Sequence, residues 1–112
     1  MWLPERVIFL AVEHPKRELQ MLIIETRYIV DPALAEPHKQ SHVEWVRKYI
    51  AEGLFILAGP KLEAGGGVIV AHAVNDERLQ AILKEDSYVS EGIVEYKVSA
   101  FNPLFKGAPF QA

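Results

Sequence analysis

The amino-acid sequence predicts an α+β fold in which four strands and two helices follow one another in the order β-α-β-β-α-β. Two stretches with the apolar periodicity of a helix alternate with four stretches rich in β-branched and aromatic residues. Gly and Pro residues mark the boundaries between these stretches. A chain of 112 residues forms one domain, because it is long enough for one hydrophobic core and too short for two.

The first strand is predicted over residues 22–30. This segment, LIIETRYIV, has the composition of a strand and is followed by Asp31-Pro32. Proline restricts the residue before it to extended backbone and cannot continue a sheet ladder, so the strand ends here. Residues 32–37 are predicted to form a connection to the next element.

The first helix is predicted over residues 38–53, with its start near Pro37 or His38 and Gly53 as the C′ residue that ends it. At about 100° per residue, His42 falls in the middle of the apolar face of this helix. That face carries Val43, Trp45, Val46, Tyr49 and Ile50, and the opposite side carries Glu44, Lys48 and Glu52.

The second and third strands are predicted on either side of a glycine-rich turn. Residues 54–58 (LFILA) form an apolar run that indicates a buried strand ended by Gly59-Pro60. Residues 65–67 are three consecutive glycines, which are typical of a loop or hairpin tip. Residues 68–74 are predicted as the third strand, with one face formed by Val68, Val70, His72 and Val74.

The second helix and fourth strand complete the pattern. Asn75 is a favourable N-cap, and two acidic residues follow it at the positive end of the helix dipole. We expect the helix to stop near residues 85–86 and residues 87–91 to form a short irregular link. Residues 93–101 alternate between apolar and polar side chains, as a half-buried strand does, and Pro103 ends that strand.

These elements together predict a ferredoxin-like fold, with two helices on one face of a four-stranded antiparallel sheet. The opposite face of such a small sheet is often too apolar to be left in water. Two copies of the chain would cover it by pairing their sheets, so we expect a homodimer or a higher homo-oligomer.

Composition excludes several classes of function. Cysteine is absent, which rules out disulfides, thiolate nucleophiles and iron–sulfur clusters, and which fits a reducing, cytoplasmic location. The net charge is −3 and no cluster of Lys and Arg stands out, so nucleic acid is not an expected partner. No segment is long and apolar enough to span a membrane.

The chain is predicted to have short segments on both sides of its domain. Residues 1–20 contain an apolar run of six residues, too short for a membrane span and without the features of a signal peptide, and they are expected to form an N-terminal extension. The strand pattern begins abruptly at Met21, which is a candidate start of the protein. Residues 21–105 form the predicted domain, and residues 106–112 form a C-terminal tail that is poorly ordered or taken up by a neighbouring subunit.

Three motifs resemble those of the YCII-related family. The first helix carries Lys39, His42 and Trp45 in the pattern K-x-x-H-x-x-W. Residues 52–60 read E-G-L-F-I-L-A-G-P, and residues 86–93 read D-S-Y-V-S-E-G-I. The likeness covers most of the chain from the first strand onward, and this family is similar in turn to dimeric α/β-barrel enzymes such as muconolactone isomerases.

The resemblance implies a dimeric α/β-barrel and a His–Asp pair formed by His42 and Asp86. It also implies acid–base chemistry on a small ring-derived metabolite, such as dehydrochlorination or isomerisation. Ser87 stands where the family commonly has proline, and Lys39 where it commonly has arginine. The residues expected to contact a substrate are Lys39, Tyr88, Ser87, Gly59 and Pro60.

The chemistry of a His–Asp pair fits that implication. A carboxylate hydrogen-bonded to one imidazole nitrogen fixes the tautomer, so the other nitrogen is free to move a proton. Such a base suits proton abstraction next to a carbonyl or a phenol, followed by elimination or isomerisation. Covalent catalysis is not expected, because the chain has no cysteine and no serine in a nucleophile-elbow context.

Each of these residues also has a purely structural interpretation. His42 can be a hydrogen-bonded core residue, Asp86 a helix-end residue and Tyr88 a packing residue, while Gly59-Pro60 can simply end a strand. The chain can accordingly be a non-catalytic ligand-binding or sensor module, or a structural dimerisation domain. The third possibility requires a filled core beside His42.

A metal site is not predicted. His38 and His42 are spaced i, i+4 on one helix face, as in some zinc sites, but no Glu follows His38 in the H-E-x-x-H pattern. A third ligand would have to come from His72 or a carboxylate. We therefore expect no metal and no cofactor, and a small molecule as the partner of the site.

Overall fold

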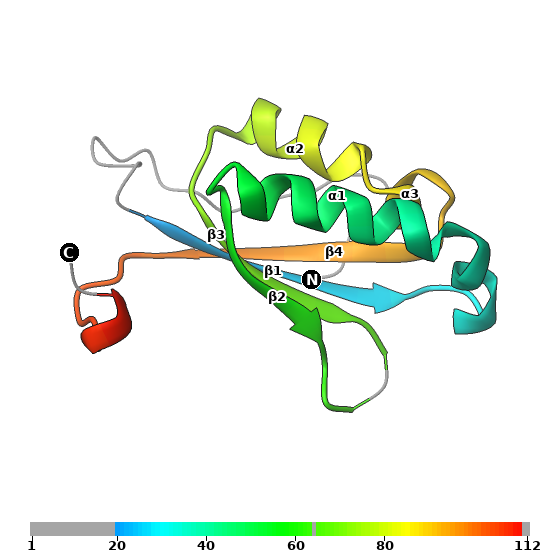
Figure 1. Ribbon diagram of the computed structural model, residues 1–112, viewed down its shortest axis with the longest axis horizontal. Helices are drawn as coiled ribbons and strands as arrows, with labels where there is room; N and C mark the ends of the chain where they lie inside the picture. The colour runs from blue at the N-terminus through cyan, green and yellow to red at the C-terminus, as the bar shows by residue number, and fades with distance from the viewer. Residues whose placement is uncertain (1–19, 64, 111–112) are drawn as a thin grey trace.

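The computed structural model describes residues 20–63 and 65–110, which form an antiparallel sheet of four strands with helices packed on one face (Figure 1). Its order is β2-β3-β1-β4, and the predicted ferredoxin-like α+β fold is confirmed. The strands are β1 (Met21–Tyr28), β2 (Phe55–Pro60), β3 (Gly67–His72) and β4 (Val94–Phe101), and the α-helices are α1 (Lys39–Ala51), α2 (Asp76–Lys84) and the single turn α3 (Ser87–Ser90). The predicted N-terminal extension lies outside the described residues, apart from its last residue.

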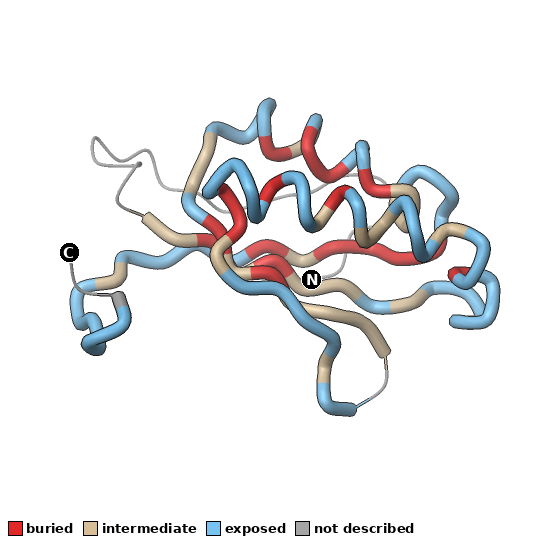
Figure 2. Tube along the Cα trace, in the orientation of Figure 1, coloured by how far each residue is buried: buried red, intermediate tan, exposed pale blue. Residues whose placement is uncertain are grey.

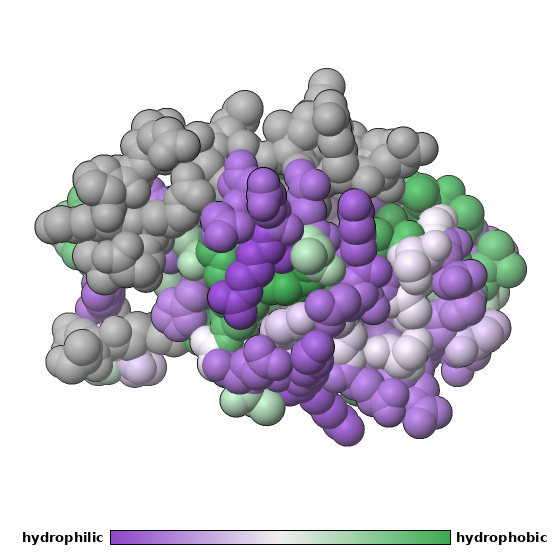
Figure 3. Space-filling view, turned by 90° about the horizontal axis from the view of Figure 1, so that it is seen from above, coloured by the Kyte–Doolittle hydropathy of each residue, from purple (hydrophilic) through white to green (hydrophobic). Residues whose placement is uncertain are grey.

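The hydrophobic core lies between the sheet and the helices. On the central strand β1, Leu22 and Ile24 are buried, and Ile24 is paired with Ile69 on one side and Val98 on the other. Figure 2 shows the buried residues on the inner side of the helices and on the strands beneath them. The outer surface of the helical layer is largely hydrophilic where its residues are described (Figure 3).

The two long helices are joined to each other and to the sheet by large side chains. Trp45 and Tyr49 are the buried residues of α1, and the indole Nε1 of Trp45 donates to the carbonyl oxygen of Ile82 in α2 at 2.8 Å. Both aromatic rings also pack against Phe55 of β2. Ile50 lies at the edge of the apolar arc of this helix and is 40% exposed.

Strand β2 differs from its prediction in length and burial. It continues through Gly59 and Pro60, which pair with Val68 and Gly67 of β3, instead of ending before them. It is also an edge strand that is mostly exposed from Leu57 onward, and not a buried strand. An edge position explains both errors, since proline is tolerated in a ladder only where its missing N–H faces no neighbour.

Two segments predicted as irregular are short helices. Residues 32–37 belong to the 3₁₀ helix η2 (Pro32–His38), whose N-cap Asp31 accepts a hydrogen bond from the backbone N–H of Ala33. Residues 87–90 form α3, capped in the same manner by Asp86. In both cases an aspartate satisfies a backbone donor that would otherwise be unpaired at the helix start.

The predicted ends of the longer helices are confirmed. Asn75 accepts from the backbone N–H of Arg78 at 2.8 Å as the N-cap of α2, which ends at Lys84 with Glu85 as its C-cap. Gly53 follows the C-cap of α1 with φ of 80°, a left-handed conformation that glycine adopts without strain. Within the described residues, no helix is long and apolar enough to cross a membrane.

The face of the sheet opposite the helices carries partly or largely exposed apolar side chains. Leu57 of β2 is 54% exposed and Phe101 of β4 is 43% exposed. Between them Ile23 and Val70 pair across β1 and β3 and are half-buried. After β4, the 3₁₀ turn η3 (Ala108–Phe110) lies away from the helical layer, beyond the end of the sheet (Figure 1).

Candidate functional site

The site lies where α1 and α3 meet over the first residues of β4. His42 lies in the second turn of α1, and Asp86 precedes α3 as its N-cap. The structure places the imidazole Nδ1 of His42 2.7 Å from Oδ1 of Asp86. The carboxyl group is completely buried, while the histidine side chain is 24% exposed.

Asp86 accepts three hydrogen bonds. Its Oδ1 accepts from His42 and from the backbone N–H of Tyr88 at 3.0 Å, and its Oδ2 accepts from the hydroxyl of Tyr96 at 2.5 Å. A buried carboxylate is strongly destabilised without such donors, and three of them fix its orientation. Asp86 is therefore a rigid acceptor aimed at one nitrogen of His42.

This arrangement determines the tautomer of His42. A carboxylate oxygen only accepts, so the Nδ1 that faces it carries the proton. In the neutral ring the lone pair then lies on Nε2, and no hydrogen bond to Nε2 is found within the described residues. Nε2 is thus the atom at which His42 can take up a proton.

Two tyrosines hold the pair in place. The ring of Tyr88 stacks on His42 with centroids 3.9 Å apart and planes 2° from parallel. Burial raises the pKa of Tyr88, with smaller contributions from Tyr28, Asp86 and Glu36. Burial likewise raises the pKa of Tyr96 well above 10.0, and the nearby charge of Asp86 adds to this effect. Tyr96 therefore remains a phenol that donates to Asp86.

Ser87 connects α3 to the start of α1. Its hydroxyl donates to the backbone carbonyl of His38 at 3.1 Å and accepts from Ser41 at 2.7 Å. Ser87 does not line the cavity described below. Its contacts instead hold the N-terminus of α3 against α1, which places Asp86 beside His42.

A cavity of about 470 Å³ lies between α1 and the sheet, within the size range of small-molecule sites. His42 lines it, together with four of the other residues expected to contact a substrate: Lys39, Tyr88, Gly59 and Pro60. The sequence prediction missed several lining residues, which are Thr26 and Tyr28 of β1, Val43, Val46 and Arg47 of α1, Ala58 of β2, Gly66 to Ile69 at and after the hairpin turn, and Val94 and Tyr96 of β4.

Some of these residues carried a signal in the sequence. Val43 and Arg47 are four and eight residues after Lys39, so they share its helix face. Tyr96 belongs to the inward-facing set of the alternating fourth strand. Thr26 and Tyr28 also carried a signal, because they follow Leu22 and Ile24 at the two-residue period of a strand and so share the face that the helices cover.

The glycine turn closes one side of the cavity against β1. Gly66 has φ of 144°, and a Cβ at this position would lie 2.0 Å from the carbonyl oxygen of Thr26. The N–H of Gly67 donates to the Thr26 hydroxyl at 2.8 Å. Only glycine allows this close approach of the hairpin to the strand.

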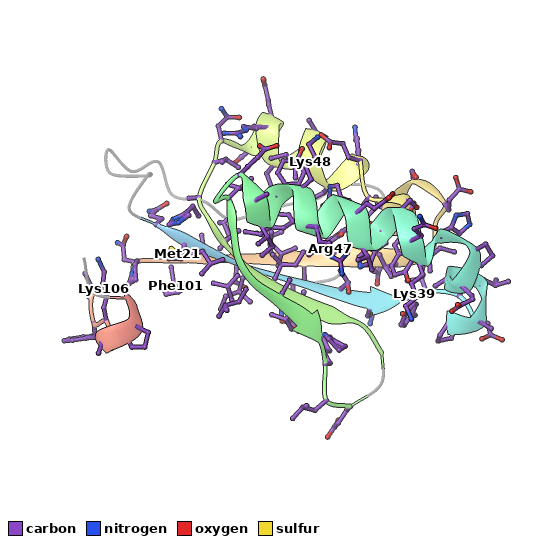
Figure 4. The ribbon with its side chains drawn as sticks, in the orientation of Figure 1. Met21, Lys39, Arg47, Lys48, Phe101 and Lys106 are labelled. Atoms are coloured by element: carbon purple, nitrogen blue, oxygen red, sulfur yellow. The ribbon has the colours of Figure 1, made fainter. Side chains whose placement is uncertain are left out.

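Two cations of α1 lie on the side of the helix that faces the sheet. Figure 4 shows Lys39 and Arg47 on this side, whereas Lys48 lies toward α2. Lys48 is paired with Glu85 at 3.1 Å, but neither Lys39 nor Arg47 forms an ion pair within the part of the chain that the structure describes. No group of three His, Asp or Glu side chains in the same part of the chain is arranged to hold a metal ion.

Fold and site together define a small ferredoxin-like α+β protein with a ligand-sized cavity and a histidine–aspartate pair at its wall. A model of the YCII-related domain family matches residues 9–102. The chain therefore belongs to the YCII-related family. A search of curated proteins found no match.

A solved structure supports the fold independently. The chain is similar to the 5-chloro-2-hydroxyhydroquinone dehydrochlorinase of Burkholderia phenoliruptrix AC1100, solved as a complex with 2,5-dihydroxybenzoquinone. The TM-score is 0.62 and the sequence identity 13%, and the alignment covers 82% of this chain and 99% of the dehydrochlorinase. At 13% identity, this likeness shows that the two proteins share a fold and nothing more.

Proposed function

We propose that this protein is an enzyme that transfers protons on a small, ring-derived metabolite, with His42 as the acid–base group and Asp86 as the residue that orients it. The observation that carries the proposal is a cavity of about 470 Å³ lined by an imidazole whose Nδ1 is held by a fully buried carboxylate. A base that is fixed in this way is suited to general acid–base catalysis.

The reaction class we favour is elimination, with isomerisation as the second possibility. In a dehydrochlorination, Nε2 of His42 would accept a proton from the substrate while chloride leaves, and no oxidant or reductant is needed. In an isomerisation the same nitrogen would return the proton to another atom. The likeness to a dehydrochlorinase of the same fold favours the first reaction.

A non-catalytic ligand-binding or sensor module is the main alternative. The same residues would then hold a ring compound without converting it. A purely structural dimerisation domain fits less well, because it calls for a filled core and two satisfied ring nitrogens at His42. The cavity beside His42 argues against it, and so does Nε2, to which no residue within 20–63 and 65–110 is hydrogen-bonded.

We further propose that two copies pair through the open faces of their sheets, which carry Leu57, Phe101 and Ile23. Such pairing would bury apolar side chains that one copy leaves in water. Two further predictions stay as they were made from the sequence. One is the division of the chain into residues 1–20, 21–105 and 106–112, and the other is the cytoplasmic location.

The direct test is chloride release from 5-chloro-2-hydroxyhydroquinone, the substrate named for the structural neighbour. The wild-type protein should release chloride faster than buffer alone. His42→Gln removes the base and should lower the rate on the order of 10²- to 10⁴-fold. Lys48→Gln, on the outer side of the same helix, is the matched control and should keep the wild-type rate.

Two results would count against the proposal. A His42→Gln variant as fast as the wild type would exclude His42 as the base. A wild-type protein that binds the compound and leaves it unchanged, in this assay and in one for isomerised product, would favour the sensor alternative.

A further inference from the structure

The charged side chains that line the cavity are all basic. Lys39, His42 and Arg47 contribute to the lining, and none of the Asp and Glu residues that the structure describes does. Asp86 lies behind His42, and its carboxylate already accepts three hydrogen bonds. Glu36 influences the hydroxyl of Tyr88 but is not part of the lining. A cavity with two permanent cations and no carboxylate attracts an anion.

The two cations lie at different heights along one helix. Eight residues separate Lys39 from Arg47, which is about 12 Å along the axis of α1. His42 lies between them, five residues or about 7.5 Å from Arg47. A ligand with its charged group at Arg47 therefore needs roughly the length of one ring to place a reacting atom at His42.

The remaining walls are suited to a ring. They consist largely of aliphatic and aromatic side chains, and Tyr88 is stacked flat on His42 with Tyr28 beside it. Such walls contribute to affinity through apolar burial but do not neutralise a charge. The apolar lining is formed by Val43, Val46, Val68, Ile69 and Val94.

We infer that the cavity selects anionic ring compounds, and that Arg47, assisted by Lys39, is the specificity-determining residue that binds their acidic oxygen group. The guanidinium offers a planar pair of donors that matches a carboxylate and also accepts an ionised phenol. The inference rests on the proposed function in taking the same cavity as the substrate site. Its test, however, measures binding and needs no turnover.

The test compares two probes of the same shape by titration calorimetry. Benzoate carries the carboxylate, and benzamide replaces it with an uncharged group of similar size. The wild-type protein should bind benzoate more tightly, on the order of 10- to 100-fold, as expected for a charge-assisted pair. Raising the salt concentration should reduce this preference, since Arg47 is exposed.

Variants then assign the preference to a residue. Arg47→Gln should remove most of it, Arg47→Lys should keep part of it, and Lys39→Gln should reduce it less. Lys48→Gln removes the same charge from the neighbouring position outside the cavity and should leave the preference unchanged. Because Arg47 is exposed and has no ion pair within the described residues, its replacement should not disturb folding.

Equal binding of benzoate and benzamide by the wild type would overturn the inference, and so would no binding of either. A preference that survives in both Arg47→Gln and Lys39→Gln would also overturn it. These outcomes are separate from the catalytic proposal: His42→Gln should still bind benzoate, whereas Arg47→Gln should lose benzoate and keep His42 intact.

Discussion

At the scale of single residues, Asp86 is the most deeply buried charged side chain among the described residues. Asp86 is fully buried and receives donors from α1, from α3 and from β4. A purely structural N-cap needs only the backbone N–H of Tyr88. The hydrogen bonds from His42 and Tyr96 go beyond that need. Tyr96 fixes the orientation of the carboxylate, and the carboxylate in turn holds the imidazole of His42 in one tautomer.

Tyr96 gives a test of this network through stability. Tyr96→Phe leaves Oδ2 of Asp86 without its donor and should lower the free energy of unfolding by about 1–3 kcal/mol at neutral pH. Urea denaturation of both proteins measures this difference. Tyr28→Phe, which removes a cavity hydroxyl with no hydrogen bond to Asp86, should cost less.

The raised pKa of Tyr96 adds a pH dependence. Above pH 10.0 the unfolded chain releases the proton of Tyr96 while the folded protein retains it, because burial raises the folded-state pKa. This contribution to stability is complete below pH 10.0 and is lost as the pH rises toward the folded-state value. The stability of the wild type should thus fall more steeply in alkali than that of Tyr96→Phe, and parallel curves would contradict a buried phenol.

At the scale of elements, the sequence predicted the order of strands and helices better than their edges. Apolar periodicity and the Asn75 cap were sufficient for α1 and α2, since both signals are local. The extent and exposure of β2 were not predictable in this way, because they depend on its edge position in the sheet. The helix α3 was missed because a single turn is too short for a periodic pattern.

The residues of the candidate site were likewise predictable where the signal in the sequence was local, and not where it depended on contacts between distant elements. The pairing of His42 with Asp86 was expected from a family resemblance, and the structure places these groups within hydrogen-bond distance. Tyr96, Thr26 and Arg47 were missed, although Arg47 shares a helix face with Lys39. Contacts between elements distant in sequence, such as Tyr96 with Asp86, require the register of β4 and not its composition.

The hairpin between β2 and β3 provides a prediction at this scale. Gly66→Ala would place a methyl group against the backbone of Thr26 in a backbone conformation that alanine rarely adopts. We expect a loss of about 2–5 kcal/mol in the free energy of unfolding, from strain and overpacking together. Gly53→Ala is the control: its φ is also positive, but a Cβ there meets nothing within 4 Å, so thermal or urea denaturation should show a loss of about 1–2 kcal/mol.

A variant Gly66→Ala with wild-type stability would show that the hairpin does not approach β1 as closely as described. The cavity would then lack the wall formed by Gly66 and Gly67.

At the scale of the whole molecule, the helices cover one face of the sheet and leave the other exposed (Figures 1 and 2). Leu57 and Phe101 lie on this open face with large exposed fractions. If two copies pair through it, Leu57→Glu with Phe101→Glu should shift the protein from dimer to monomer in analytical ultracentrifugation. Both side chains are exposed in one copy, so the monomer itself should remain folded.

Leu62→Glu serves as the control for this experiment. Leu62 is fully exposed in the turn after β2 and does not belong to the open face of the sheet. The Leu62→Glu variant should sediment as the wild-type protein does. A wild-type protein that sediments as a monomer at all concentrations would contradict pairing through the sheet.

The proposed chemistry depends on Asp86 holding His42 with its proton on Nδ1, so that Nε2 is the atom that accepts a proton. Nitrogen-15 NMR of the histidine ring, recorded where the imidazole is neutral, reads the protonation of each nitrogen separately. We predict a protonated Nδ1 and an unprotonated Nε2 for His42, and a loss of this preference in Asp86→Ala. A wild-type spectrum with the proton on Nε2 would show that Asp86 does not hold His42 in this tautomer.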